Sequence, residues 1–549
     1  MSGNAHRPPC VGCSSPMKFD IAFVNASIID GSGARARSGQ VGIVGHRIAW
    51  IGYDDSDESA ERHTASCSID VHGAVLCPGF IDIHTHSDLT LLVDGAGESK
   101  LRQGVTTEVV GNCSFSAFPI EPSRLDLHAD HLARVTAAVR PWWTDHDGYA
   151  QALEDEGIAL NVAALAGHGT LRVAAMGVEA RDPDSNELQR MIHDLEESLA
   201  QGAFGMSTGL THVPSAYGGF EEVLALAEVL AEHGALYATH ARAIGKDERD
   251  AVAEAIEVGR ATGVTVEFSH LAINRPERWG TGDELLGMFD RAQRDGVDIL
   301  FDVYPYDASS SSLTQYLPGW TQEGGTEEMR HRLGAPDVRR RALADMQAGW
   351  FNGIPWLWER FLVSSTPDGA FVGQTLRQVA DALRLAPDEL TLRLCELYGN
   401  EIQVVLFYRT DADVAAFLRH PLAVVGSDGN AIPLDQASAK PHPRSFGTFP
   451  RVLGRYVREQ GILELPDAVR KMTGEPARRL GLVDRGLIEV GMAADLVVLD
   501  PRVVADQATF EDPANAPLGI HHVMVGGTLV LTDDVVTGDR PGRVLRRQR

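Results

Sequence analysis

The chain has 549 residues, with 49 Lys and Arg against 76 Asp and Glu, and a formal net charge of −27 at pH 7. So acidic a composition argues against nucleic-acid binding, which needs a basic surface, and against attraction to anionic membranes. Hydrophobic residues make up 44% of the chain, as in ordinary globular proteins. The sequence contains no run of eighteen consecutive apolar residues, so it predicts no membrane-spanning helix.

The two ends of the chain share one pattern. Residues 1–18 are polar and contain no apolar secretory core, so we predict a disordered tail and a cytoplasmic protein, with Met17 as a second candidate start. Residues 19–78 and 484–549 contain short apolar runs separated by turn residues, which is typical of strands. We therefore predict one small β-sandwich domain built from both termini.

The middle of the chain, residues 79–483, alternates short apolar runs with amphipathic helical stretches, which predicts parallel strands that each precede a helix. Eight runs qualify as strands: 75–86, 106–113, 161–169, 203–210, 235–242, 265–272, 298–306 and 422–429. Eight such units predict an α/β fold of the (β/α)8 TIM-type barrel class. A doubly wound open sheet is the alternative. Residues 313–420 form a long insertion that we expect to cover the site.

Metal-ligand side chains follow the apolar part of several runs, where the catalytic residues of such barrels lie. They are His84 and His86 after the first run, Cys113 after the second, His240 after the fifth, His270 after the sixth and Asp428 after the eighth. Each alone has an ordinary explanation, such as a packed histidine, an inert thiol or a helix cap. Together, cysteine and histidine suit Zn²⁺. We predict one tight zinc site, with a second, weaker site as an open alternative.

Longer motifs carry a family resemblance that extends from about residue 19 to the C-terminus. They are GFIDIHTHSD at 79–88, GNC at 111–113, GHGTLR at 167–172, ATHAR at 238–242, YPY at 304–306 followed by Ser310, GSDG at 426–429, HPRSFGTFPRVLG at 442–454, GMAADLVVLDP at 491–501 and GDRPGRVLR at 538–546. By these motifs the chain resembles the N-acyl-D-amino-acid deacylases (D-aminoacylases) of the amidohydrolase superfamily.

The resemblance implies a role for each metal-ligand residue. Cys113, His240 and His270 would hold the tightly bound zinc. His84 and His86 would line the second, weaker site, toward which Cys113 also reaches. Many relatives in the superfamily bridge two metals with a carboxylated lysine, but no lysine ends any of the eight predicted strands. Cys113 is the natural substitute.

The resemblance also implies how substrate is bound. Asp428 would be the general acid and base, and Arg444 would pair with the substrate α-carboxylate. Tyr304 and Ser310 would assist that anchoring or polarise the scissile carbonyl. A planar guanidinium suits a carboxylate because it can bind both oxygens, although a surface salt bridge would also explain Arg444.

These roles predict zinc-dependent hydrolysis of small N-acyl-D-amino acids to a carboxylate and a free D-amino acid. Zinc lowers the pKa of bound water from about 16 toward 7, and Asp428 can carry the proton to the leaving nitrogen. The alternatives are another metal-dependent amidohydrolase (a cyclic amidase, dipeptidase or xenobiotic amide hydrolase) or a non-enzymatic barrel. A hydrophobic D-residue is the default substrate, because an acidic one needs an extra Arg or Lys that the sequence does not locate.

Several other residues keep two interpretations each. His168 either faces the site or packs, and His212 either contacts substrate or lies in a loop. Four tryptophans fall in the 313–420 insertion: Trp320, Trp350, Trp356 and Trp358. They form either the core of the insertion, which we favour, or an apolar wall for the substrate.

Overall fold

The computed structural model describes residues 17–55, 63–135, 139–243, 247–351, 353–435 and 439–548. Its centre is a parallel sheet of eight strands in the order β16-β12-β11-β10-β9-β8-β7-β6. The sheet closes where Thr85, beyond β6, pairs with Gly429, beyond β16. The predicted (β/α)8 barrel is therefore confirmed. Of the predicted tail, residues 1–16 lie outside the described residues.

Every barrel strand lies within or overlaps a predicted run. The strands are β6 (Phe80–Asp82), β7 (Val105–Val110), β8 (Asn161–Gly167), β9 (Gly205–Gly209), β10 (Leu236–His240), β11 (Thr265–Phe268), β12 (Ile299–Val303) and β16 (Ala423–Val425). Helices cover the outside of the barrel, so both faces of the sheet are buried and the strands read as continuous apolar runs.

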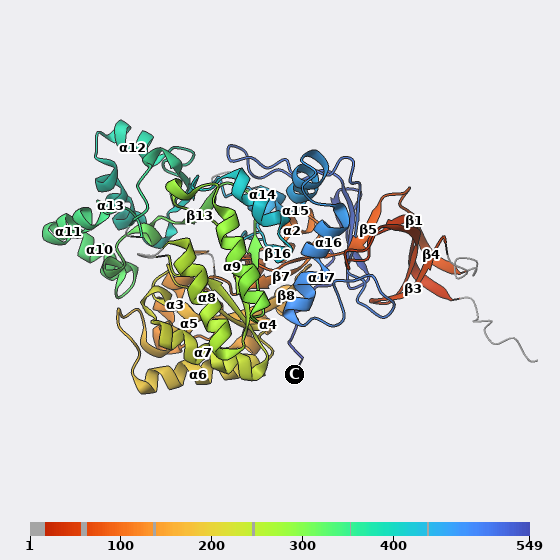
Figure 1. Ribbon diagram of the computed structural model, residues 1–549, viewed down its shortest axis with the longest axis horizontal. Helices are drawn as coiled ribbons and strands as arrows, with labels where there is room; N and C mark the ends of the chain where they lie inside the picture. The colour runs from red at the N-terminus through yellow and green to blue at the C-terminus, as the bar shows by residue number, and fades with distance from the viewer. Residues whose placement is uncertain are drawn as a thin grey trace, which may run out of the picture.

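Helices that follow the barrel strands along the chain pack around the barrel (Figure 1). They include α3 (Leu125–Leu132), α4 (His146–Glu156), α5 (His168–Met176), α6 (Ser185–Ala200), α7 (Phe220–His233), α8 (Glu248–Thr262), α9 (Gly282–Arg294), α14 (Asp411–Arg419), α15 (Arg444–Arg451), α16 (Leu465–Met472) and α17 (Gly474–Leu480). Local sequence sets where they begin. Asp184 and Glu187 form a reciprocal capping box at the start of α6, which satisfies backbone N–H groups that have no partner within the helix.

Strands from both termini form one nine-stranded sheet beside the barrel. They are β1 (Lys18–Ile28), β2 (Arg37–Val44), β3 (Arg47–Tyr53), β4 (Thr64–Asp70), β5 (Val75–Pro78), β17 (Leu496–Leu499), β18 (Ile520–Val525), β19 (Thr528–Thr532) and β20 (Val535–Val536). Phe23 and Val41 share an apolar core with Leu496 and Met524, so the two ends of the chain fold together. A small β-domain formed by both termini is thus confirmed.

One predicted strand is two strands in the structure. The run 75–86 divides at Gly79, with β5 in the terminal sheet and β6 in the barrel. The close approach of Thr106 explains the glycine, because a Cβ on Gly79 would lie 2.1 Å from the Thr106 hydroxyl oxygen. The two sheets are therefore joined through a single residue.

The segment between β12 and α14 folds around its own core, at the end of the molecule opposite β1 and β4 (Figure 1). It contains β13 (Ser309–Ser312), β14 (Phe361–Ser365), β15 (Gln403–Leu406), α10 (Thr326–Gly334), α11 (Pro336–Met346), α12 (Leu376–Leu383) and α13 (Pro387–Tyr398). Trp350 is buried in that core, and Trp320, Trp356 and Trp358 pack against it. The bounds that the sequence assigned to the three parts of the chain stay predictions.

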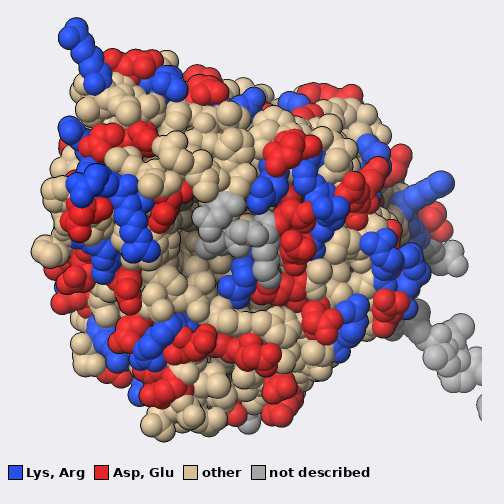
Figure 2. All heavy atoms as spheres, turned by 60° about the vertical axis from the view of Figure 1, so that its left-hand side comes forward, with Lys and Arg blue, Asp and Glu red and all other residues tan. Residues whose placement is uncertain are grey.

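The surface agrees with the charge count. Figure 2 shows acidic and basic side chains interspersed over one face, without a continuous basic patch on that face. Within the described residues, no helix combines the length and apolar character needed to cross a bilayer.

Candidate active site

The predicted ligand residues lie together at the carboxyl ends of the barrel strands. His84 and His86 follow β6, Cys113 follows β7, His240 ends β10, His270 follows β11 and Asp428 follows β16. Three of them have positive φ angles: Cys113 at 51°, His270 at 39° and Asp428 at 53°. Such backbone costs about 1–3 kcal/mol in a non-glycine residue and is concentrated at functional sites. Their placement is thus maintained against local strain.

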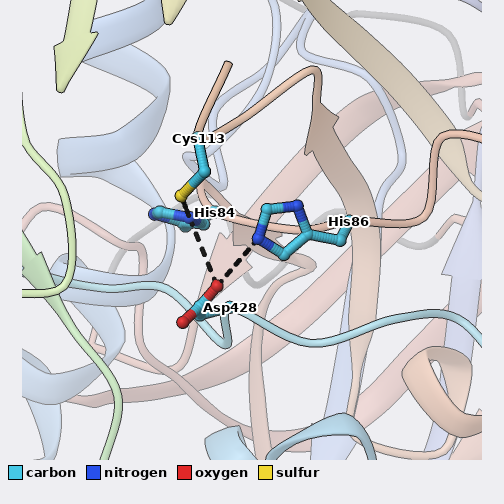
Figure 3. Close-up of side chains that lie close together, drawn as sticks. All are labelled: His84, His86, Cys113 and Asp428. Carbon is cyan, nitrogen blue, oxygen red and sulfur yellow. Dashed lines mark hydrogen bonds and ion pairs between the residues drawn. The ribbon is translucent and has the colours of Figure 1, made fainter. Parts of the chain in front are cut away.

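Two groups of donor atoms meet at Cys113. His84, His86, Cys113 and Asp428 form one group, Cys113, His240 and His270 form the other, and the ligand atoms of each lie within 4.8 Å of one another. The thiol sulfur lies 3.3 Å from His84 Nε2 and 3.5 Å from His270 Nε2. Figure 3 shows Cys113, His84 and His86 directed toward Asp428. The geometry therefore brings together two adjacent groups of possible ligand atoms that share one sulfur.

Groups outside the cluster hold two of the imidazole rings. Asp302 on β12 lies 2.9 Å from His84 Nδ1, which leaves His84 Nε2 directed at Cys113. The Thr211 hydroxyl lies 2.6 Å from His240 Nε2, which leaves His240 Nδ1 2.9 Å from His270 Nε2. Metal-binding histidines usually have such a partner on the outer nitrogen, because it fixes the tautomer and the ring orientation.

The Cys113–His240–His270 group is electrostatically prepared to bind a cation. Burial alone would raise the pKa of the Cys113 thiol, but the neighbouring histidines outweigh it and hold that pKa well below its usual value. Burial and the charge of His270 lower the pKa of His240. A thiolate beside a neutral imidazole is the protonation state that a metal requires of its ligands.

The His84–His86–Asp428 group is differently charged. His86 Nε2 lies 2.9 Å from Asp428 Oδ1. Burial opposes protonation of His86, but Asp428 and Cys113 raise its pKa to about 9. Burial would raise the pKa of Asp428, whereas Arg444 and His84 outweigh it and hold that pKa well below its usual range. A metal at this position would have to displace a proton from His86.

The donor set fits zinc, on the observations above. Cysteine sulfur and imidazole nitrogen are the ligands that Zn²⁺ prefers, and the outer nitrogens of His84 and His240 are already held. Among the described residues that border the cavity around these groups, none is a lysine. The buried Lys100 instead pairs with Asp82 at 2.7 Å and donates to the Ser427 hydroxyl at 2.6 Å, and so supports the loop that carries Asp428.

The groups predicted to bind substrate border the same cavity, which has a volume of about 250 Å³. Arg444 pairs with Asp428 Oδ2 at 2.6 Å and lies 3.4 Å from the Ser310 carbonyl oxygen. The Tyr304 ring is fully buried and its hydroxyl has no hydrogen-bond partner within the described chain. Arg444, Tyr304 and Ser310 are therefore brought together, and Arg444 is not a surface residue.

The structure separates the two uncertain histidines. His212 lies in the loop after β9, as expected, and it is buried there and borders the cavity with its ring 4.8 Å from that of His240. His168 is fully buried, with one ring nitrogen 2.7 Å from Ser215 Oγ and the other 2.7 Å from Glu222 Oε1. It does not border the cavity and serves packing.

Sequence reasoning missed three residues of the site: Asp302, Thr211 and Arg409. A signal existed for Asp302, because a carboxylate inside the apolar run ILFDV must be buried with a partner. Thr211 follows the fourth strand in a loop without a motif. Arg409 borders the cavity from the loop after β15, and only the packing of the insertion places it there.

Comparison with known proteins agrees with this geometry. The model of the amidohydrolase family Amidohydro_3 matches residues 68–347 and 373–531. An N-acyl-D-glutamate deacylase of Alcaligenes xylosoxydans xylosoxydans is 38% identical, over 96% of this chain and 97% of that protein. A D-aminoacylase of the same organism is 36% identical, over 97% of this chain and 99% of that protein.

A solved structure of a similar protein contains zinc. The crystal structure of N-acyl-D-glutamate deacylase from Bordetella bronchiseptica, complexed with zinc and a phosphonate inhibitor, superimposes with a TM-score of 0.81. It is 34% identical and covers 96% of this chain and all of that one. The chain therefore belongs to the amidohydrolase family, hydrolases that act on C–N bonds other than peptide bonds. Within that family it groups with the N-acyl-D-amino-acid deacylases, as the motifs predicted.

Proposed function

We propose that this protein hydrolyses the amide bond of N-acyl-D-amino acids and releases a carboxylate and a D-amino acid. The observation that carries the proposal is the convergence of Cys113, His240 and His270 with Asp428 and Arg444 around one cavity. The relatives named above support it.

Cys113, His240 and His270 would hold the tightly bound zinc. Bound there, zinc would lower the pKa of water and polarise the scissile carbonyl. The pKa shifts described above favour one tight site here and a weaker second one at His84 and His86. Binding of a second metal would be weakened because the metal would first have to displace the proton on His86.

The two carboxylate oxygens of Asp428 have different partners. Oδ2 is held by Arg444 at 2.6 Å, whereas Oδ1 faces His84 and His86 at 3.4 and 2.9 Å. Oδ1 would accept the proton of the attacking water and then donate it to the leaving nitrogen. The lowered pKa of Asp428 keeps the carboxylate ionised at neutral pH, which is the form that can accept a proton.

Arg444 provides the anchor for substrate. Its guanidinium contacts Asp428 at one nitrogen and directs the other toward Ser310, beside the unpaired Tyr304 hydroxyl. A substrate α-carboxylate bound here would lie next to the general base. The scissile amide, one bond from the α-carbon, would then lie toward the metal ligands.

The first test is chiral. Zinc-loaded protein is incubated with racemic N-acetyl methionine, leucine, phenylalanine, glutamate and aspartate, and the released amino acids are separated by enantiomer. We expect only D-amino acids. Absence of any release, with zinc bound, would move the substrate to another amide or cyclic amide.

The second test addresses the mechanism. Asp428→Asn should lower kcat by roughly 10²–10⁴-fold with zinc content unchanged, because it removes the proton carrier. Asp194→Asn is the matched control, since Asp194 on α6 is also buried beside an arginine but does not border the cavity. Near-normal turnover of Asp428→Asn with zinc bound would contradict the assigned role.

A further inference from the structure

The cavity above the metal ligands carries more positive than negative fixed charge. Among the described residues that border it are four arginines (Arg134, Arg275, Arg409 and Arg444) and two carboxylates (Glu248 and Asp428). This excess of cations lies within a chain whose net charge is −27. An arginine-rich cavity in an acidic protein is a site for an anionic ligand.

The arginines differ in their partners. Arg444 is paired with Asp428, and Arg275 lies 3.9 Å from Glu277. Arg134 donates to the Gln322 side chain at 2.9 Å. Arg409 has neither an ion pair nor a hydrogen bond from its side chain within the described residues, and its Nε is buried without a partner. Arg134 also has no ion pair within the described residues, and its Nε and Nη1 are buried without a partner. Arg409 differs from it in making no side-chain hydrogen bond to the described chain at all.

Arg409 lies beside the predicted anchor for the substrate. Its guanidinium carbon is 4.3 Å from the centre of the Tyr304 ring, and that of Arg444 is 5.0 Å from the same centre. The hydroxyl of this tyrosine is buried without a hydrogen-bond partner in the described chain. Two guanidinium groups on one tyrosine suit a ligand with two carboxylates a few bonds apart.

We propose that Arg409 binds the side-chain carboxylate of the substrate, so that the protein acts on N-acylated acidic D-amino acids such as N-acyl-D-glutamate. This inference rests on the proposed function, which assigns the α-carboxylate to Arg444. When the α-carboxylate is bound by Arg444, the guanidinium of Arg409 still has no carboxylate partner. An unpaired, partly desolvated arginine rejects a neutral analogue, because the analogue leaves the cation without an acceptor.

The test compares two substrates of nearly the same shape, N-acetyl-D-glutamate and N-acetyl-D-glutamine, with N-acetyl-D-methionine as an apolar third. The zinc-loaded protein should favour glutamate over glutamine by about 10–100-fold in kcat/KM, as expected for a charge-assisted hydrogen-bond pair. Arg409→Met should lower kcat/KM for glutamate by about the same factor, mainly through KM, and leave glutamine and methionine unchanged or improved. Arg409→Lys should restore part of the glutamate activity.

Arg134→Met serves as a comparison, because Arg134 borders the same cavity without contacting Tyr304. It should not change the ratio of glutamate to glutamine. Thermal melting and zinc content establish that each variant is folded and loaded, and Arg409→Gln replaces Arg409→Met if the latter does not fold.

Three outcomes would overturn the inference while leaving the proposed function intact. One is a wild-type preference for methionine or glutamine over glutamate. Another is an equal loss on all three substrates in Arg409→Met, which would place the α-carboxylate on Arg409. The third is a change of the glutamate-to-glutamine ratio in Arg134→Met alone. Absence of hydrolysis of every N-acetyl-D-amino acid would instead remove the proposed function, and this inference with it.

Discussion

Two buried clusters in this barrel are built from the same kinds of side chain and have different uses. One is the metal centre around Cys113. The other, which we name the α5–α7 network, consists of His168, Arg172 and Glu222. In the network, both nitrogens of His168 have fixed protein partners, and Arg172 donates to Glu222 Oε1 at 2.7 Å. Every ring nitrogen of that histidine is used.

In the metal centre, potential ligand atoms face one another instead. His240 Nδ1 lies 2.9 Å from His270 Nε2, and the Cys113 sulfur lies within 3.5 Å of two histidines. Such an arrangement leaves lone pairs converging on a common point. The difference indicates how a candidate metal ligand can be told from a packed histidine at a strand end. A candidate ligand has one ring nitrogen that faces other possible ligand atoms, whereas both ring nitrogens of a packed histidine have fixed protein partners. Burial or position in the strand does not distinguish the two.

The largest expected effect comes from Cys113→Ser. It removes the sulfur shared by both ligand groups, so zinc content should fall well below one per chain. Activity should fall by about 10³-fold, the equivalent of several kcal/mol of transition-state stabilisation. Cys395→Ser is the control, because Cys395 is equally buried but lies in the core of the insertion. Elemental analysis and turnover decide the point, and full zinc content in Cys113→Ser would contradict it.

An intermediate effect is expected from Asp302→Asn. This change weakens the group that orients His84, a ligand of the proposed second, weaker site. Loss of such an outer partner should lower the metal affinity of that second site by about 10–100-fold. Chelator competition measures the affinity. Asp298→Asn is the control, because Asp298 directly precedes β12, is half-exposed and pairs with Arg479. It should leave the metal affinity unchanged. Equal affinities in the two variants would show that Asp302 has no orienting role.

The smallest effect on activity is expected in the α5–α7 network. Glu222→Gln breaks a buried ion pair, so it should lower the free energy of unfolding by about 3 kcal/mol. Turnover and zinc content should stay at wild-type values. Loss of zinc from this variant, detected by the same elemental analysis, would erase the distinction between the two clusters.

The same variant has a pH signature. Burial would raise the pKa of Glu222, but His168 and Arg172 outweigh it and lower that pKa from 4.5 to about 2. The stabilisation is therefore complete above the ordinary pKa and is lost as the pH falls from about 5 toward 2. Melting temperatures of wild type and Glu222→Gln should converge over that range. A constant difference would contradict the shift.

The sequence predicted the barrel well because its signals are local. Each strand is a short apolar run, and the ligand residues follow those runs directly, as at Cys113 and His240. His168 follows its strand in the same way, yet it packs. Its partners Ser215 and Glu222 lie 47 and 54 residues further along the chain, so no local pattern could show that they meet.

The same reason explains Arg409. It stands in a loop between β15 and α14, without periodicity or motif, and nothing nearby in the sequence connects it with Tyr304. The contact depends on how about a hundred residues of insertion fold back on the barrel. The sequence therefore located the chemistry and could not locate the side chain that we propose selects the substrate.

The separate core of the insertion has a consequence for adaptability. The segment from β13 to β15 packs around its own apolar cluster, whereas the ligands of the metal centre stand on the barrel. Mutations at Trp350, which borders the cavity from that separate core, would reshape the cavity wall while the metal ligands keep their own supporting barrel strands. A directed-evolution library confined to this segment could therefore be screened for activity on other N-acyl amino acids while the metal ligands and Asp428 stay unmutated.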